Sequence, residues 1–119
     1  MGTFTAEVRI ASPASPEKAQ ELKLLVDTGS AYTWVAASVL AELGLSPSMT
    51  RRIRTIQGQI IERPAAVVQI TLEGQTLPTI CLFGQPGDLE VLGAVTLEEF
   101  GLGVDPIQQR LIPAVQFGA

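Results

Sequence analysis

Hydrophobic and polar residues alternate along the first part of the chain. Every second residue from Phe4 to Ile10 is apolar, and a period of two is typical of a β-strand with one buried face. Similar stretches, bounded by turn residues, predict further strands. These lie at residues 20–26, 32–35, 65–72, 75–83, 89–92, 102–105 and 110–113, with a hairpin at 53–62. The sequence therefore predicts an all-β fold with a mainly antiparallel sheet.

Glycines mark the tips of two hairpins in this pattern. Gln57-Gly58 is expected at the tip of the first hairpin and Glu73-Gly74 at the tip of the second. Apolar residues at helical spacing predict a short helix between residues 36 and 43, which the following glycine can end. Thr96 and Glu99 form a capping-box pattern that predicts the start of a second short helix.

Composition and charge narrow the classes of function. A length of 119 residues fits one domain, residues 1–119. Hydrophobic residues make up 46% of the chain and charged residues only 17%, so few charged side chains are available to cover the surface of a monomer. Association between copies of the chain would explain this composition. The net charge of −4 argues against a nucleic-acid partner. Four arginines form a local basic cluster, which we interpret as solvated side chains of a hairpin: Arg51, Arg52, Arg54 and Arg63.

No apolar run approaches the length of a membrane span, about 18 residues, and the N-terminus has no apolar signal core. We therefore expect a soluble, cytoplasmic protein with no membrane partner.

The absence of histidine and the single cysteine limit the available chemistry. Without histidine there is no Ser-His or Cys-His pair and little scope for zinc, and Cys81 alone cannot form an internal disulfide. Carboxylates remain, and Asp27 stands inside the apolar stretch LLVDTGSAYTWV. A carboxylate there costs free energy unless it is hydrogen-bonded, paired or protonated, which predicts a functional role. We expect no metal and no cofactor.

Two short segments resemble the motifs of a known family. Asp27-Thr28-Gly29-Ser30 after an apolar strand, and Val91-Leu92-Gly93 before a short helix, resemble the retropepsin-like aspartic proteases. Thr33 and the glycine-tipped hairpin support this resemblance, which covers nearly the whole chain. The tail FGLGVDPIQQRLIP resembles the single-domain bacterial members. The resemblance implies a closed β-barrel in which the Gln57-Gly58 hairpin acts as a flap over a peptide cleft.

The resemblance also implies roles for individual residues. Asp27 would activate water together with a partner carboxylate through a shared proton, which is the chemistry of an acid protease. Thr28 would hold the loop through its hydroxyl, and Gly29 would let the substrate backbone approach closely. The expected substrate-binding residues are Ser30, Ala31, Tyr32, Ile56, Gln57, Gly58, Gln59 and Leu92.

The chain carries a single D-T-G, whereas pepsin-like chains carry two. An active aspartic endopeptidase would therefore be a homodimer, with one Asp27 from each copy at the two-fold axis. Phe4, Val115 and Phe117 are candidate interface residues. The chain departs from viral members, which usually have alanine and then an acidic residue after D-T-G, and commonly an arginine where Ala94 stands here.

Two other interpretations fit parts of the sequence. A catalytically silent dimer could bind an extended peptide without cutting it, because binding by strand addition needs the barrel and the flap but no working pair of carboxylates. Alternatively, an unrelated small β-barrel could use the Asp27 side chain only to cap a turn. The second interpretation leaves the Val91-Leu92-Gly93 pattern and the hairpin unexplained.

Overall fold

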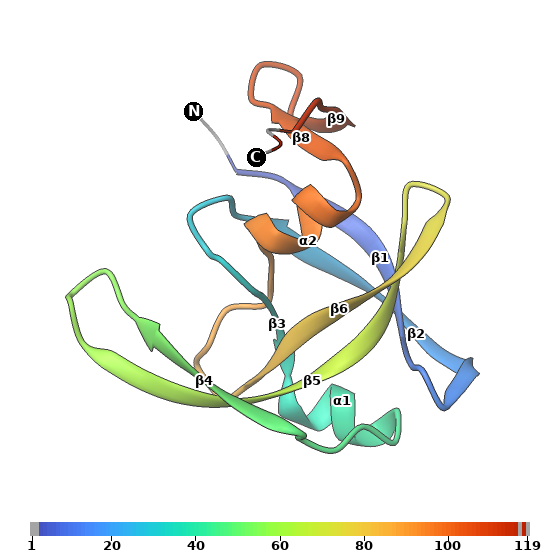
Figure 1. Cartoon of the computed structure of the whole chain (residues 1–119), viewed down its shortest axis with the longest axis vertical. Helices are drawn as coiled ribbons and strands as arrows, with labels where there is room; N and C mark the ends of the chain where they lie inside the picture. The colour runs from blue at the N-terminus through green and yellow to red at the C-terminus, as the bar shows by residue number, and fades with distance from the viewer. Residues whose placement is uncertain (1–2, 117, 119) are drawn as a thin grey trace.

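The computed structural model describes residues 3–116 and residue 118, and it is mostly β-sheet (Figure 1). Two short helices interrupt the strands. In chain order the elements are β1 (Thr5–Ser12), β2 (Ser15–Val26), β3 (Thr33–Ala36), α1 (Ala37–Glu42), β4 (Met49–Arg54), β5 (Ile60–Leu72), β6 (Gln75–Gly84), β7 (Val91–Leu92), α2 (Ala94–Glu99), β8 (Leu102–Asp105) and β9 (Arg110–Pro113).

Seven strands form one sheet in the order β1-β2-β7-β3-β6-β5-β4. Strand β1 also pairs with β5, with Ile10 opposite Ile70, so that six strands form a ring and β4 extends from it. Among the strands of the described residues, only the β2–β7 and β3–β6 pairs are parallel. Strands β8 and β9 make a separate two-stranded sheet. The predicted fold class, all-β and mainly antiparallel with short helices, is confirmed.

The alternating pattern of the sequence places one face of each strand in a common core. In β1, Val8 and Ile10 are buried whereas Glu7 and Arg9 are exposed. Leucines, isoleucines and valines from β2, β3, β5 and β6 meet them inside the ring. This burial is the main source of stability in such a fold, since apolar area removed from water contributes about 25 cal/mol per Å².

Strand β5 is longer than the sequence pattern predicts. The two predicted hairpins share it, since it pairs with β4 through its first half and with β6 through its second half. The apolar pattern breaks at Glu62, Arg63 and Pro64, although the backbone continues as a strand through all three. The β4–β5 hairpin extends away from the ring, at the left of Figure 1.

The second helix begins differently from the prediction. Gly93 is the N-cap of α2, and no side chain caps the helix. Thr96 lies inside the helix and is fully buried, so the predicted capping box is wrong. The Thr96 hydroxyl instead points into the core, where it forms hydrogen bonds with two other buried threonines, Thr33 and Thr79. The first helix is as predicted and is followed by Gly44 at φ 83°, a conformation that favours glycine.

Within the described residues, neither helix is long and apolar enough to cross a membrane. Of the candidate interface residues, Val115 is fully exposed and Phe4 packs partly against the core. Phe117 lies outside the described residues.

Candidate active site

Asp27 begins the tight turn that follows β2. Its backbone N–H donates to the carbonyl of Leu92 at 3.1 Å, which ties the turn to β7. Ser30 N–H donates to the Asp27 carbonyl at 3.2 Å, and Gly29 N–H donates to Asp27 Oδ1 at 2.9 Å. A side chain at position 29 would crowd that oxygen, because an added Cβ would lie 3.2 Å from it. The turn thus holds a partly exposed carboxylate in one orientation.

The segment after β7 crosses directly beside this turn. Ala94 N–H donates to the Ser30 carbonyl at 2.8 Å, and Val95 N–H donates to the Ala31 carbonyl at 2.9 Å. A Cβ on Gly93 would lie 2.3 Å from the Tyr32 carbonyl oxygen, which is a clash with backbone. Glycine is therefore required at position 93 by the close approach of two chain segments.

A buried network of threonine hydroxyls supports the crossing. Thr33 Oγ1 accepts a hydrogen bond from Gly93 N–H at 3.1 Å and lies 2.7 Å from Thr96 Oγ1. Thr96 Oγ1 is also 3.0 Å from Thr79 Oγ1, and Thr79 donates to Glu99 at 2.7 Å. All three threonines are almost completely buried. Because these buried hydroxyls are shielded from water, they depend on one another for hydrogen bonds, and the network therefore fixes the backbone beneath Asp27.

A groove of about 800 Å³ lies between the Asp27 turn and the β4–β5 hairpin. Most of its side chains are apolar or aromatic, as is usual for a ligand site. Its lining comprises residues 27 and 29–32, Trp34, residues 52–57, Ile61, residues 87–89 and Val91.

The hairpin tip above the groove is a short turn. Thr55 and Gln59 pair through their backbones at 2.8 Å, and Gly58 adopts φ 86°. Arg54 also donates to the Gly58 carbonyl at 3.2 Å. The Ile56 side chain is fully exposed, at 104%. An exposed isoleucine at a hairpin tip is available for contact with another molecule.

Seven of the expected site residues line the groove together, and four do not. Those that line it are Asp27, Gly29, Ser30, Ala31, Tyr32, Ile56 and Gln57. Thr28 is exposed on the turn, and Gly58 and Gln59 are exposed at the hairpin tip, outside the groove lining. The Leu92 side chain is fully buried in the core, so Leu92 serves the site through its carbonyl bond to Asp27.

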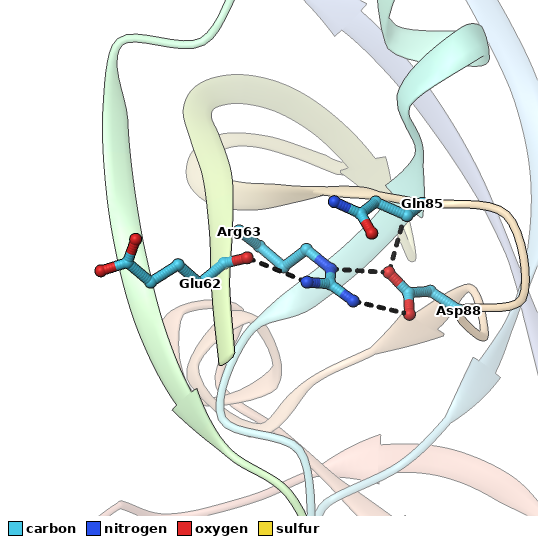
Figure 2. Close-up of polar contacts among 4 residues, drawn as sticks. All are labelled: Glu62, Arg63, Gln85 and Asp88. Atoms are coloured by element: carbon cyan, nitrogen blue, oxygen red, sulfur yellow. Dashed lines mark hydrogen bonds and ion pairs between the residues drawn. The ribbon is translucent and has the colours of Figure 1, made fainter. Parts of the chain in front are cut away.

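Sequence analysis missed an ion pair beside the groove, between Arg63 of β5 and Asp88 of the loop before β7 (Figure 2). The Arg63 side chain is only 13% exposed, so the interpretation of all four clustered arginines as solvated is wrong for this one. The Arg63 guanidinium holds the pKa of the Asp88 carboxyl below its usual value, chiefly through their hydrogen bond. The two residues stand 25 positions apart, and no local pattern in the sequence indicates their contact.

Comparisons with known proteins agree with this fold. The aspartyl protease family model matches residues 7–100, which include both crossing segments and the hairpin. The solution structure of the simian foamy virus (mac) protease is similar, with a TM-score of 0.57 and 22% identity, over 81% of this chain and 93% of that chain. The EIAV protease complexed with the inhibitor HBY-793 has a TM-score of 0.63 and 20% identity, over 84% of this chain and 89% of that chain. No curated protein matches the chain.

The solved structures that the chain resembles are retroviral proteases, so its fold is retropepsin-like, as the sequence motifs indicated. At these identities the structural likeness shows the fold, whereas the family match covers most of the chain. The chain belongs to the aspartyl protease family.

Proposed function

We propose that the chain is an aspartic endopeptidase that acts as a homodimer, with the Asp27 carboxylates of two copies at one site. The observation that carries this proposal is the position of Asp27: a carboxylate oriented by the Gly29 amide and lining a largely apolar groove, in a member of the aspartyl protease family.

The need for a second copy follows from the carboxylates that line the groove. Within the described part of the chain these are Asp27 and Asp88. Both oxygens of Asp88 already accept hydrogen bonds from Arg63, and Oδ2 also accepts one from Gln85 N–H at 2.8 Å. A carboxylate held ionised in this way is a poor proton donor, so Asp88 does not supply the second catalytic group.

In the proposed reaction, one Asp27 carboxylate acts as base and the other, protonated, acts as acid. The base takes a proton from a water molecule while that water attacks the peptide carbonyl carbon, and the acid protonates the carbonyl oxygen. The first carboxyl then gives the proton that it took to the amide nitrogen, the second carboxylate takes one back from a hydroxyl of the tetrahedral intermediate, and the C–N bond breaks to leave a carboxylic acid and an amine.

The substrate in this proposal is an extended peptide with apolar side chains. Gly29 lines the groove without a side chain and would let the peptide backbone approach closely, and the exposed hairpin tip with Ile56 would act as a flap over it. Trp34, Ile61 and Leu89 offer apolar surface along the groove.

A cleavage assay on a peptide library, with and without pepstatin, tests this proposal. We expect pepstatin-sensitive cleavage that Asp27→Asn abolishes. Asp105→Asn is the matched control and should retain activity, since Asp105 ends β8, bonds the turn that follows, and lies outside the groove lining. Peptide binding with no cleavage at any pH from 3 to 8 would contradict the proposal and favour the silent peptide-binding dimer.

A further inference from the structure

The Arg63–Asp88 pair joins two walls of the groove that are distant in sequence. Arg63 belongs to β5, the second strand of the hairpin, and Asp88 belongs to the loop that joins β6 to β7 (Figure 2). Arg63 Nε donates to Asp88 Oδ2 at 2.8 Å, and Nη2 donates to Oδ1 at 3.2 Å. The side chains are only 13% and 21% exposed. A two-pronged, largely buried pair of this kind is stronger and more directional than an exposed ion pair.

Further contacts fix the orientation of both side chains. Arg63 Nη1 donates to the Glu62 carbonyl at 2.9 Å, so all three guanidinium nitrogens are engaged. Asp88 closes its own turn, because its N–H donates to the Gln85 carbonyl at 2.9 Å while its Oδ2 accepts Gln85 N–H. The loop is held again two residues later, where Glu90 accepts a hydrogen bond from Ala36 N–H at 3.0 Å.

The residue between these two anchors faces the groove. Leu89 is 69% exposed and lines the groove. The Arg63 guanidinium also lies over the Trp34 ring, 5.8 Å from its centroid, and Trp34 lines the groove as well. Ile61, two positions before Arg63 on the same face of β5, is a third lining residue.

We propose that Arg63 and Asp88 are positioning residues that hold Trp34, Ile61 and Leu89 at a fixed separation, and so make the groove select peptides with a bulky apolar side chain at that point. Asp88 lines the groove, but its carboxylate oxygens already accept hydrogen bonds from Arg63 and Gln85 N–H, so the pair acts through the three apolar residues and not by bonding the peptide. The inference rests on the proposed function only in taking a peptide as the ligand of the groove.

The test measures peptide binding by the fluorescence of Trp34, the single tryptophan of the chain, in full-length protein carrying Asp27→Asn so that no peptide is cut. The probes are a peptide series in which each position in turn carries leucine, phenylalanine or alanine. For the unmodified pair we expect one position where the bulky residue binds at least about tenfold more tightly than alanine, a difference of about 1.4 kcal/mol.

Adding Asp88→Asn should reduce that preference to less than about threefold and speed hydrogen exchange at residues 85–90. Arg63→Lys, which keeps the charge but loses the planar fork, should reduce it in the same way and serves if the first variant fails to fold. Asp105→Asn, which alters the Arg110–Asp105 pair away from the groove, should leave it unchanged. Circular dichroism and the unfolding midpoint establish that each variant is folded.

The outcomes distinguish failure of the positioning role from failure of the proteolytic function. A preference that survives in folded Asp88→Asn or Arg63→Lys protein overturns the positioning role, as does the absence of any peptide preference in the Asp27→Asn protein. If the parent cleaves no peptide but the Asp27→Asn protein shows the preference and the pair variants lose it, the proteolytic function fails while the positioning role stands.

Discussion

Removing the Thr33 hydroxyl tests directly how the crossing beneath Asp27 is held. Replacing Thr33 with valine keeps the side-chain volume and the β-branched shape but removes the oxygen. Gly93 N–H then loses the acceptor that it has at 3.1 Å, in a buried position. Thr96 keeps Thr79 as its partner at 3.0 Å, so only one buried group is left without a hydrogen bond.

A buried donor without a partner costs about 1–3 kcal/mol. We therefore expect Thr33→Val to lower the free energy of unfolding by about 2 kcal/mol, which corresponds to a fall in Tm of about 8 °C for a domain of this size. Urea unfolding followed by circular dichroism measures the change. Because the bond lies directly beneath the Asp27 turn, we also expect a loss of cleavage in folded protein.

The matched control is Thr76→Val. Thr76 Oγ1 lies 2.8 Å from Thr71 Oγ1, but the residue is exposed and water can replace the bond. We expect this variant to stay within about 0.5 kcal/mol of the parent. The argument would be refuted if Thr33→Val were as stable as the parent, or if the two variants lost the same amount.

Three further predictions concern Gly93, Cys81 and the hairpin tip. Gly93→Ala should be strongly destabilised, by about 3 kcal/mol or more, because its Cβ would meet the Tyr32 carbonyl at 2.3 Å; equal unfolding midpoints in urea would contradict the clash. Burial raises the pKa of the Cys81 thiol to about 12, above the ordinary value of 9.0, so the proton that it keeps stabilises the fold fully below about pH 9 and this contribution is lost as pH rises toward 12. As the pH is raised from 9 to 12, the unfolding midpoint of the parent should therefore decrease relative to that of Cys81→Ala. A difference between the two proteins that stays constant with pH would contradict this prediction. Hydrogen exchange at residues 56–60 should be fast in the free protein and slower with a peptide-like inhibitor, and unchanged exchange would argue against a flap.

The sequence predicted most of the strands because their hydrophobic pattern has a clear period. Strands β8 and β9 have the predicted bounds, and the β5–β6 hairpin turns at Glu73 and Gly74, which both adopt positive φ. The continuity of β5 was missed because Glu62, Arg63 and Pro64 resemble a break between strands. Their place in the strand depends on pairing with β4, which is a contact between segments and not a local preference.

The candidate site was predictable where its motif is local and not where it depends on long-range contact. The tripeptide that begins at Asp27 indicated the turn, and Val91-Leu92-Gly93 indicated the segment that crosses it. The roles of Thr96 and of the Arg63–Asp88 pair could not be read in this way, because each depends on partners that the fold brings together from other elements. Capping-box spacing at Thr96 was misleading because a hydroxyl bonds whichever partner the surrounding structure offers.

The central claim, that two Asp27 carboxylates form one site, is tested most directly by mixing subunits. Parent and Asp27→Asn chains are combined in equal amounts, unfolded and refolded together, and the cleavage rate is compared with that of parent protein at the same total concentration. If each site needs Asp27 from both copies, only dimers of two parent chains cut, and random pairing predicts about one quarter of the parent rate. A rate of about one half would mean that each chain works alone, and would contradict the account.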